Sequence, residues 1–166
     1  MIQIGVFLSS YNVKKGTIEV LEFILKSLEK YKDKIVFLFG GPFGGELEEF
    51  AKLCLRYGYK IIAIIPEPLD KEKTESILGK YKNIPVIYTR MSWGARMDIL
   101  ALSSDIALVI GGSPTLFSGS MVEFLLSYHS PRRPGSPLEK RIVIVYPIEE
   151  TTSDYISKVL KYGSEV

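Results

Sequence analysis

Short apolar runs rich in β-branched residues alternate along this chain with longer segments of helical spacing, and this alternation restricts the possible folds more than any other feature. The helical segments place apolar residues on one face, as Ile18, Leu21, Leu25 and Leu28 show. The runs read as strands cover 2–8, 35–39, 60–65, 84–88, 105–110 and 141–146, and the helices are expected over 17–32, 45–57, 70–81, 93–103, 119–129 and 152–162.

The strands are apolar throughout instead of alternating, which is expected when helices cover both faces of a sheet. Strict alternation of strand and helix favours a parallel, doubly wound arrangement. We therefore predict a three-layer, Rossmann-like α/β fold with about six mainly parallel strands, in the order 3-2-1-4-5-6. The 166 residues fit one domain spanning 1–166.

The charge balance and the cysteine content narrow the partners and the compartment. Lysine and arginine number 21 against 19 acidic residues, a net charge of +2, so a nucleic-acid partner is not expected. No apolar stretch approaches the ~20 residues of a membrane helix, and no signal peptide is evident. With one cysteine there is no internal disulfide, and we expect a cytoplasmic protein without membrane contact.

Ligands of doubly wound sheets bind beyond the carboxyl ends of the strands. The loops expected there are 9–16, 40–45, 89–96 and 111–120, and the unusual residues of this chain gather in them. Ser9 and Ser10 directly follow the first strand, so their hydroxyls can reach a ligand oxygen, although serine also suits an ordinary turn.

The second loop carries Gly40, Gly41, Gly44 and Gly45 between a strand and a helix. Such glycines let the backbone approach an anion, and the helix start offers N–H groups and the positive end of its dipole. The alternative is a tight turn with close helix packing. The loop fits neither the dinucleotide fingerprint nor the P-loop, because no Lys-Ser/Thr pair follows the glycines.

The third loop leads into a helix whose first turns contain Trp93 and Arg96. A guanidinium can bind phosphate through two hydrogen bonds, and an indole can stack on a base. The alternatives are a surface arginine with an ion-pair partner and a tryptophan that fills a gap in the core.

The fourth loop combines glycines and hydroxyls before an apolar helix, and its candidate phosphate ligands are Gly111, Gly112, Ser118, Gly119 and Ser120. Glu123 lies one turn into that helix, where a carboxylate can act as a base, bind ribose hydroxyls, or simply favour the helix start.

Other reactive residues point to no further chemistry. Cys54 falls on the apolar stripe of a helix and is expected in the core, while His129 is the single histidine. One histidine and one cysteine do not predict a zinc site, so we expect no metal, and no motif calls for a resident cofactor. A G-x-S-x-G hydrolase elbow is absent from the sequence.

The four loop regions together resemble the SLOG superfamily, above all its Lonely Guy (LOG) group, often labelled lysine decarboxylase-like, and molybdenum-cofactor carrier-like proteins. The matching segments are residues 4–10 (IGVFLSS), residues 40–48 (GGPFGGELE) for a G-G-x-G-G-V-M-E turn, and Arg96 ahead of the strand led by Asp105. The family motif P-G-G-x-G-T-x-x-E corresponds to Gly111–Gly112 and then 119–123. The chain departs from it at Ile110, at the inserted 113–118, and at Ser120 in place of threonine.

The resemblance implies that Arg96 and Glu123 are the catalytic pair of a phosphoribohydrolase, which cleaves the N-glycosidic bond of a nucleoside 5′-monophosphate. The inserted segment favours instead a protein that only binds a nucleotide, a signalling molecule or a molybdopterin-like ligand, because catalysis tolerates less misplacement than binding. A third reading is single-stranded DNA binding of the kind found in DNA-processing protein A, another SLOG branch. Family likeness also implies a homodimer or a higher homo-oligomer.

Overall fold

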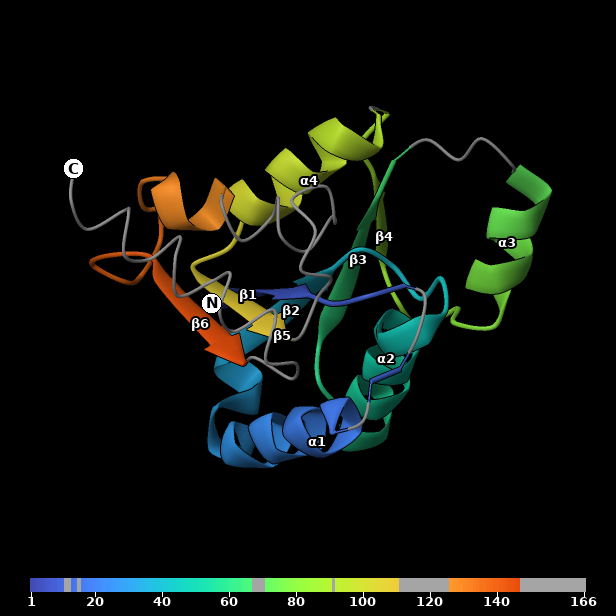
Figure 1. Ribbon diagram of the computed structural model, residues 1–166, viewed down its shortest axis with the longest axis horizontal. Helices are drawn as coiled ribbons and strands as arrows, with labels where there is room; N and C mark the ends of the chain where they lie inside the picture. Colours follow the sequence, from blue (N-terminus) through green and yellow to red (C-terminus); the bar gives the residue numbers. More distant parts are fainter. Residues whose placement is uncertain (11–12, 15, 67–70, 91, 111–125, 147–166) are drawn as a thin grey trace.

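A single sheet of six parallel strands organises the chain in its computed structural model, which describes residues 1–10, 13–14, 16–66, 71–90, 92–110 and 126–146 (Figure 1). The order across the sheet is β4-β3-β2-β1-β5-β6, and all five strand pairs are parallel. The strands are β1 (Ile2–Phe7), β2 (Ile35–Phe39), β3 (Ile61–Ile65), β4 (Val86–Tyr88), β5 (Ile106–Ile110) and β6 (Ile142–Tyr146). The predicted Rossmann-like α/β sheet is confirmed.

The position of the fourth strand differs from the expected order. β4 pairs with β3 at the edge of the sheet, where the order 3-2-1-4-5-6 had placed it beside the first strand. Its three residues leave Ile87 and Tyr88 half exposed, and Pro85 stands just before it. A short strand next to a proline is typical of a sheet edge, because an edge strand needs hydrogen bonds on one side only.

The helices lie on both faces of the sheet (Figure 1). α1 (Thr17–Ser27) and α2 (Gly45–Tyr57) cover one face, and α4 (Trp93–Leu102) covers the other. The 3-10 helix η1 (Glu29–Lys34) follows α1, and α3 (Lys71–Gly79) is a polar helix without a buried residue. Residues 126–129 are also helical. The elements thus form the three layers expected from the sequence.

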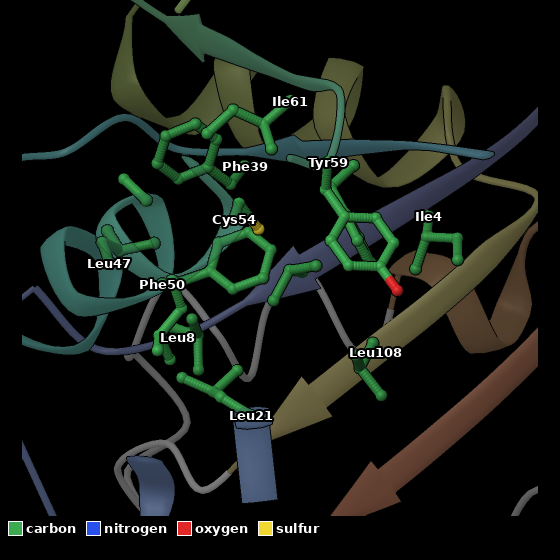
Figure 2. Packing of buried hydrophobic residues seen from close by; sticks show 14 of the residues in the cluster. Ile4, Leu8, Leu21, Phe39, Leu47, Phe50, Cys54, Tyr59, Ile61 and Leu108 are labelled. Carbon is green, nitrogen blue, oxygen red and sulfur yellow. The ribbon is translucent and has the colours of Figure 1, made fainter. Parts of the chain in front are cut away.

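The larger apolar core lies between the sheet and α1 and α2. Figure 2 shows Phe50 and Cys54 of α2 among strand residues that include Phe39 and Leu108. The rings of Phe37 and Phe50 meet edge to face, with centroids 5.4 Å apart. Burial of one such aromatic side chain stabilises the fold by roughly 1.5–3 kcal/mol, so this cluster contributes much of the stability.

The smaller core lies on the α4 face and is built from the alternate residues of the same strands. Phe7, Leu38, Ile64 and Val109 pack there with Leu100 of α4. Every residue of β2 is buried because each face of that strand meets helices. No helix within the described segments is long and apolar enough to cross a membrane.

Candidate functional site

The carboxyl ends of β1, β2 and β5 are neighbours at one edge of the sheet. The chain runs outward from β1 through β4 and then returns to the other side of β1 as β5, so the strand order reverses between β1 and β5. Doubly wound sheets bind their ligands at such a reversal. Because β4 lies at the far edge, the loops that flank the reversal are those that follow β1 and β5.

Glu46, in the first turn of α2, joins the first loop to the second. Its side chain is fully buried and accepts hydrogen bonds from the Ser9 N–H (3.1 Å), the Lys14 N–H (3.2 Å) and the Thr17 hydroxyl (2.7 Å). In the reverse direction, the Leu47 N–H donates to the Ser9 carbonyl (3.3 Å). A buried charged acceptor with several donors is a strong and directional contact. Glu46 therefore holds the Ser9 loop against the start of α2.

The glycine turn between β2 and α2 contains glycines with positive φ, among them Gly41 and Gly44. Gly41 has φ 98°, and a Cβ there would collide with Phe43 and Ile65. Gly44, the N-cap of α2, has φ 96°, and a Cβ there would stand 3.4 Å from the Ser10 carbonyl oxygen. L-residues rarely adopt such backbone angles. The turn brings its backbone close to the Ser9–Ser10 segment, as predicted for neighbouring loops.

Arg96 reaches the same edge from the opposite face of the sheet. Ser92 caps α4 by accepting the Ala95 N–H (3.4 Å), which fixes the helix start and places Arg96 in its first turns. The Arg96 side chain is buried, with 8% of the residue exposed. Its Nη1 lies 3.0 Å from the position a Cβ would take at Gly40. The arginine thus packs on the glycine that follows β2.

These contacts unite three of the four regions identified in the sequence. Ser9 and Ser10, the glycines of the second loop, and Arg96 lie together at the carboxyl edge. Trp93 is the first residue of α4, but its side chain is outside what the structure describes. Residues 111–125 are also outside the described residues, and with them the predicted ligands Gly111, Gly112, Ser118, Gly119 and Ser120 and the predicted catalytic Glu123.

Asp105, which the sequence motif links to Arg96, lies at the opposite edge. Its carboxylate accepts the Gln3 N–H (2.8 Å) and binds Arg133 through two hydrogen bonds of 3.0 Å. Burial works to raise the pKa of this carboxyl, but the hydrogen bonds from Arg133, Gln3 and Ser136 outweigh it and hold the pKa below its ordinary value. Asp105 therefore anchors the segment after residue 130 and is far from the glycine turn.

Sequence reasoning did not identify the role of Glu46. A glutamate in the first turn of a helix is common, and its partners lie 29 to 37 residues earlier in the chain. The only local signal was a glutamate directly after the glycines, at a helix position that becomes buried.

Cys54 and His129 are the two other reactive residues that the sequence singled out. Cys54 is completely buried, and burial raises the pKa of its thiol well above the ordinary range. His129 is exposed and contacts the ring of Tyr128, with centroids 5.1 Å apart. Within the described parts of the chain, no three His, Cys, Asp or Glu side chains gather as a metal site.

No family model matches the sequence, and no curated protein matches it. Solved structures match the fold. The molybdenum cofactor carrier protein of Chlamydomonas reinhardtii superposes with a TM-score of 0.62 at 20% identity, over 95% of this chain and 83% of that one. The molybdenum cofactor binding protein of Rippkaea orientalis gives 0.66 at 17% identity, over 96% and 85%.

DNA processing protein A of Streptococcus pneumoniae gives a TM-score of 0.66 at 18% identity, over 98% of this chain. The match spans 57% of that protein, so this chain corresponds to only part of it. At these identities the comparison shows a shared fold and nothing about function. The chain shares the fold of these solved structures, which include the molybdenum-cofactor carrier and DNA-processing proteins that its loop motifs resemble.

Proposed function

We propose that the protein binds a phosphorylated small molecule of the nucleotide type at the carboxyl edge of β1, β2 and β5. The observation that carries the proposal is the packing of the Arg96 guanidinium on Gly40. A cation from α4 and a glycine turn from β2 meet there, beside a serine loop fixed by Glu46. Guanidinium groups and closely approaching backbone N–H groups are the usual partners of phosphate oxygens.

The start of α2 is a weaker phosphate ligand than the glycine pattern suggested. Its Leu47 N–H already donates to Ser9, and the Glu46 carboxylate lies at the same helix end. A negative side chain there offsets the positive end of the helix dipole. We therefore assign phosphate binding to Arg96, to the backbone of Gly40–Gly41 and to the hydroxyl of Ser10, with further contacts expected from residues 111–120.

The similar structures favour a binding protein over an enzyme. Two of them are named as a carrier and a binding protein of the molybdenum cofactor. Hydrolysis of a nucleoside 5′-monophosphate stays a second proposal, and it rests on Glu123 acting with Arg96 as the resemblance implies. Binding of single-stranded DNA is a third, motivated by the likeness to DNA processing protein A and disfavoured by the net charge of +2.

A ligand screen followed by product analysis tests these proposals. Purified protein would be heated with AMP, ADP, ATP, ribose 5-phosphate, inorganic phosphate and molybdopterin-type ligands while its unfolding is recorded. A bound ligand raises the melting temperature by mass action, so stabilisation by at least one phosphate compound is expected. Release of free base from AMP would move the protein to the hydrolase class. No stabilisation by any compound would contradict the binding site itself.

Arg96→Gln is the variant that assigns the ligand to this edge. It removes the guanidinium, so the stabilisation by the best ligand should fall strongly. Arg56→Gln is the matched control, because Arg56 is exposed on α2 and pairs only weakly with Glu22 at 3.7 Å. Equal ligand response in the two variants would place binding elsewhere.

We also propose a homodimer or a higher homo-oligomer, as the family likeness implies. Light scattering of the purified chain measures its mass in solution, and a monomer at all concentrations would overturn this part of the proposal.

A further inference from the structure

A cavity of about 450 Å³ lies at the amino edge of the sheet, at the opposite end of the strands from the glycine turn. Ser127, Tyr128, Ser130, Arg132 and Lys140 line it from the segment that precedes β6, and Val143 lines it from β6. In Figure 1 this segment, coloured orange, lies beside the first residues of β6. Its size falls in the range of roughly 300–1,000 Å³ that is typical of small-molecule sites.

Ser127 supplies an unused hydrogen-bonding group in the wall of this cavity. The residue is only 1% exposed, and its hydroxyl has no hydrogen-bond partner among the described residues. Buried hydroxyls almost always have a partner, because leaving one unpaired costs stability. A ligand oxygen inside the cavity would accept the hydrogen bond that Ser127 can donate.

The charges around the cavity favour an anion. Arg132, Lys140 and Arg141 line it, and Glu139 is the one acidic residue of the lining. Arg141 donates to the backbone carbonyls of Ala101 and Leu102 at the end of α4, and to the carbonyl of Pro131. Its guanidinium is therefore already engaged by the backbone. Arg132 donates to the Leu138 carbonyl (3.1 Å) through one nitrogen, and its guanidinium carries five N–H donors in all.

The neighbouring ion pair does not neutralise this excess. Asp105 is bound by Arg133 through two hydrogen bonds, so these two residues largely balance each other's charge. Burial is the main cause that lowers the pKa of Arg141, the charge of Asp105 opposes it, and the positive charge of Arg133 adds a smaller lowering effect. A bound anion would stabilise these guanidinium groups.

We propose that this cavity is a second binding site, which takes a small organic anion. Arg132, Lys140 and the Ser127 hydroxyl bind its acidic group, and Pro131 and Val143 contact its apolar part. The shared chemistry is an oxyanion on a small apolar body, either a carboxylate or a phosphate ester. The site is separate from the proposed phosphate site at the carboxyl edge and does not depend on it.

Amide NMR spectra of the full chain test the proposal, with benzoate and phenyl phosphate as probes. Saturable shifts of the amides of Ser127, Ser130, Lys140 and Val143 are expected with at least one probe, and the stronger probe tells carboxylate from phosphate. Ser127→Ala and Lys140→Gln should each weaken binding about fivefold, the effect of one hydrogen bond or charge. Lys82→Gln, at an exposed lysine after α3, is the control and should leave binding unchanged.

The spectra of the variants also report whether each remains folded. Absence of saturable shifts at these amides with both probes would overturn the proposal. Shifts that persist unchanged in both Ser127→Ala and Lys140→Gln would overturn it too. Arg96→Gln should leave the shifts intact, because that residue lies at the other edge of the sheet.

Discussion

Nη1 of Arg96 lies 3.0 Å from the point that a Cβ would occupy on Gly40, and Cζ lies 3.4 Å from it. The two residues come from opposite layers, since Arg96 belongs to α4 and Gly40 follows β2. Glycine at this position lets the guanidinium lie directly over the backbone where the strand ends. The contact has a direct consequence for ligand binding.

Gly40→Ala should weaken the binding of phosphate compounds without unfolding the protein. The added methyl group forces the guanidinium to shift by a few tenths of an ångström, and misplacement of this kind is expected to lower affinity about tenfold. Calorimetric titration with the best ligand of the screen measures the effect. Gly79→Ala is the control, because no atom stands within 4 Å of its Cβ position. Unchanged affinity in Gly40→Ala would contradict the idea that ligand binding depends on the exact position of the Arg96 guanidinium.

Glu46→Gln should destabilise the protein by about 2–3 kcal/mol, because hydrogen bonds to a buried charged acceptor are lost and the amide N–H₂ of glutamine faces groups that are themselves donors. The three donors concerned are the Ser9 N–H, the Lys14 N–H and the Thr17 hydroxyl. Urea unfolding followed by circular dichroism measures the loss. Glu49→Gln on the same helix removes only an exposed pair with Lys52 and should cost less than about 0.5 kcal/mol. Similar losses in the two variants would contradict the role of Glu46.

The sequence predicted the layers and most element boundaries because both depend on local patterns. The helix expected at 45–57 is α2 (Gly45–Tyr57), with Gly58 as its left-handed end, and the strand expected at 35–39 is β2. The place of β4 in the sheet was not predictable in the same way, since strand order depends on which edges pair across the fold. Two local signals, Pro85 and the polar α3, were consistent with an edge strand.

The candidate site was predicted in part for a related reason. The rule that loops gather at the carboxyl ends of parallel strands identified the Ser9 and Gly40 loops, and Arg96 was proposed from its helix position. The carboxylate that joins two of these loops, Glu46, was missed because its partners are distant in sequence. Local patterns name candidate residues, but they do not say which loop is fixed to which.

Asp105→Asn should reduce the free energy of unfolding near pH 7 by about 3 kcal/mol. The substitution removes the charge of a fully buried carboxylate and leaves Arg133, whose side chain is 20% exposed, without its charged partner. The pKa of Asp105 is lower in the folded protein than in the unfolded chain, so the folded state binds fewer protons. Its stabilisation is present above the ordinary carboxyl pKa of about 3.9 and is lost as the pH falls through the lower folded value.

Urea midpoints near pH 7 and near pH 3 measure this dependence, and the gap between wild type and Asp105→Asn should narrow at the lower pH. Asp33→Asn, at an exposed position of η1, is the control and should show the same urea midpoints as the wild type at both pH values. A gap that stays constant between the two pH values would mean that the pair contributes through packing and not through charge.

The thiol of Cys54 should be inert in the folded protein, although it is the single cysteine of the chain. Its side chain is fully buried in the core formed with α2, and burial raises its pKa well above the ordinary range, so almost no thiolate exists at neutral pH (Figure 2). Labelling with an aromatic disulfide reagent should be slow in buffer and complete in concentrated guanidinium chloride. Labelling in buffer can then proceed only through opening of the core, so urea below the unfolding midpoint should accelerate it. Rapid labelling in buffer would contradict the placement of Cys54 between α2 and the sheet.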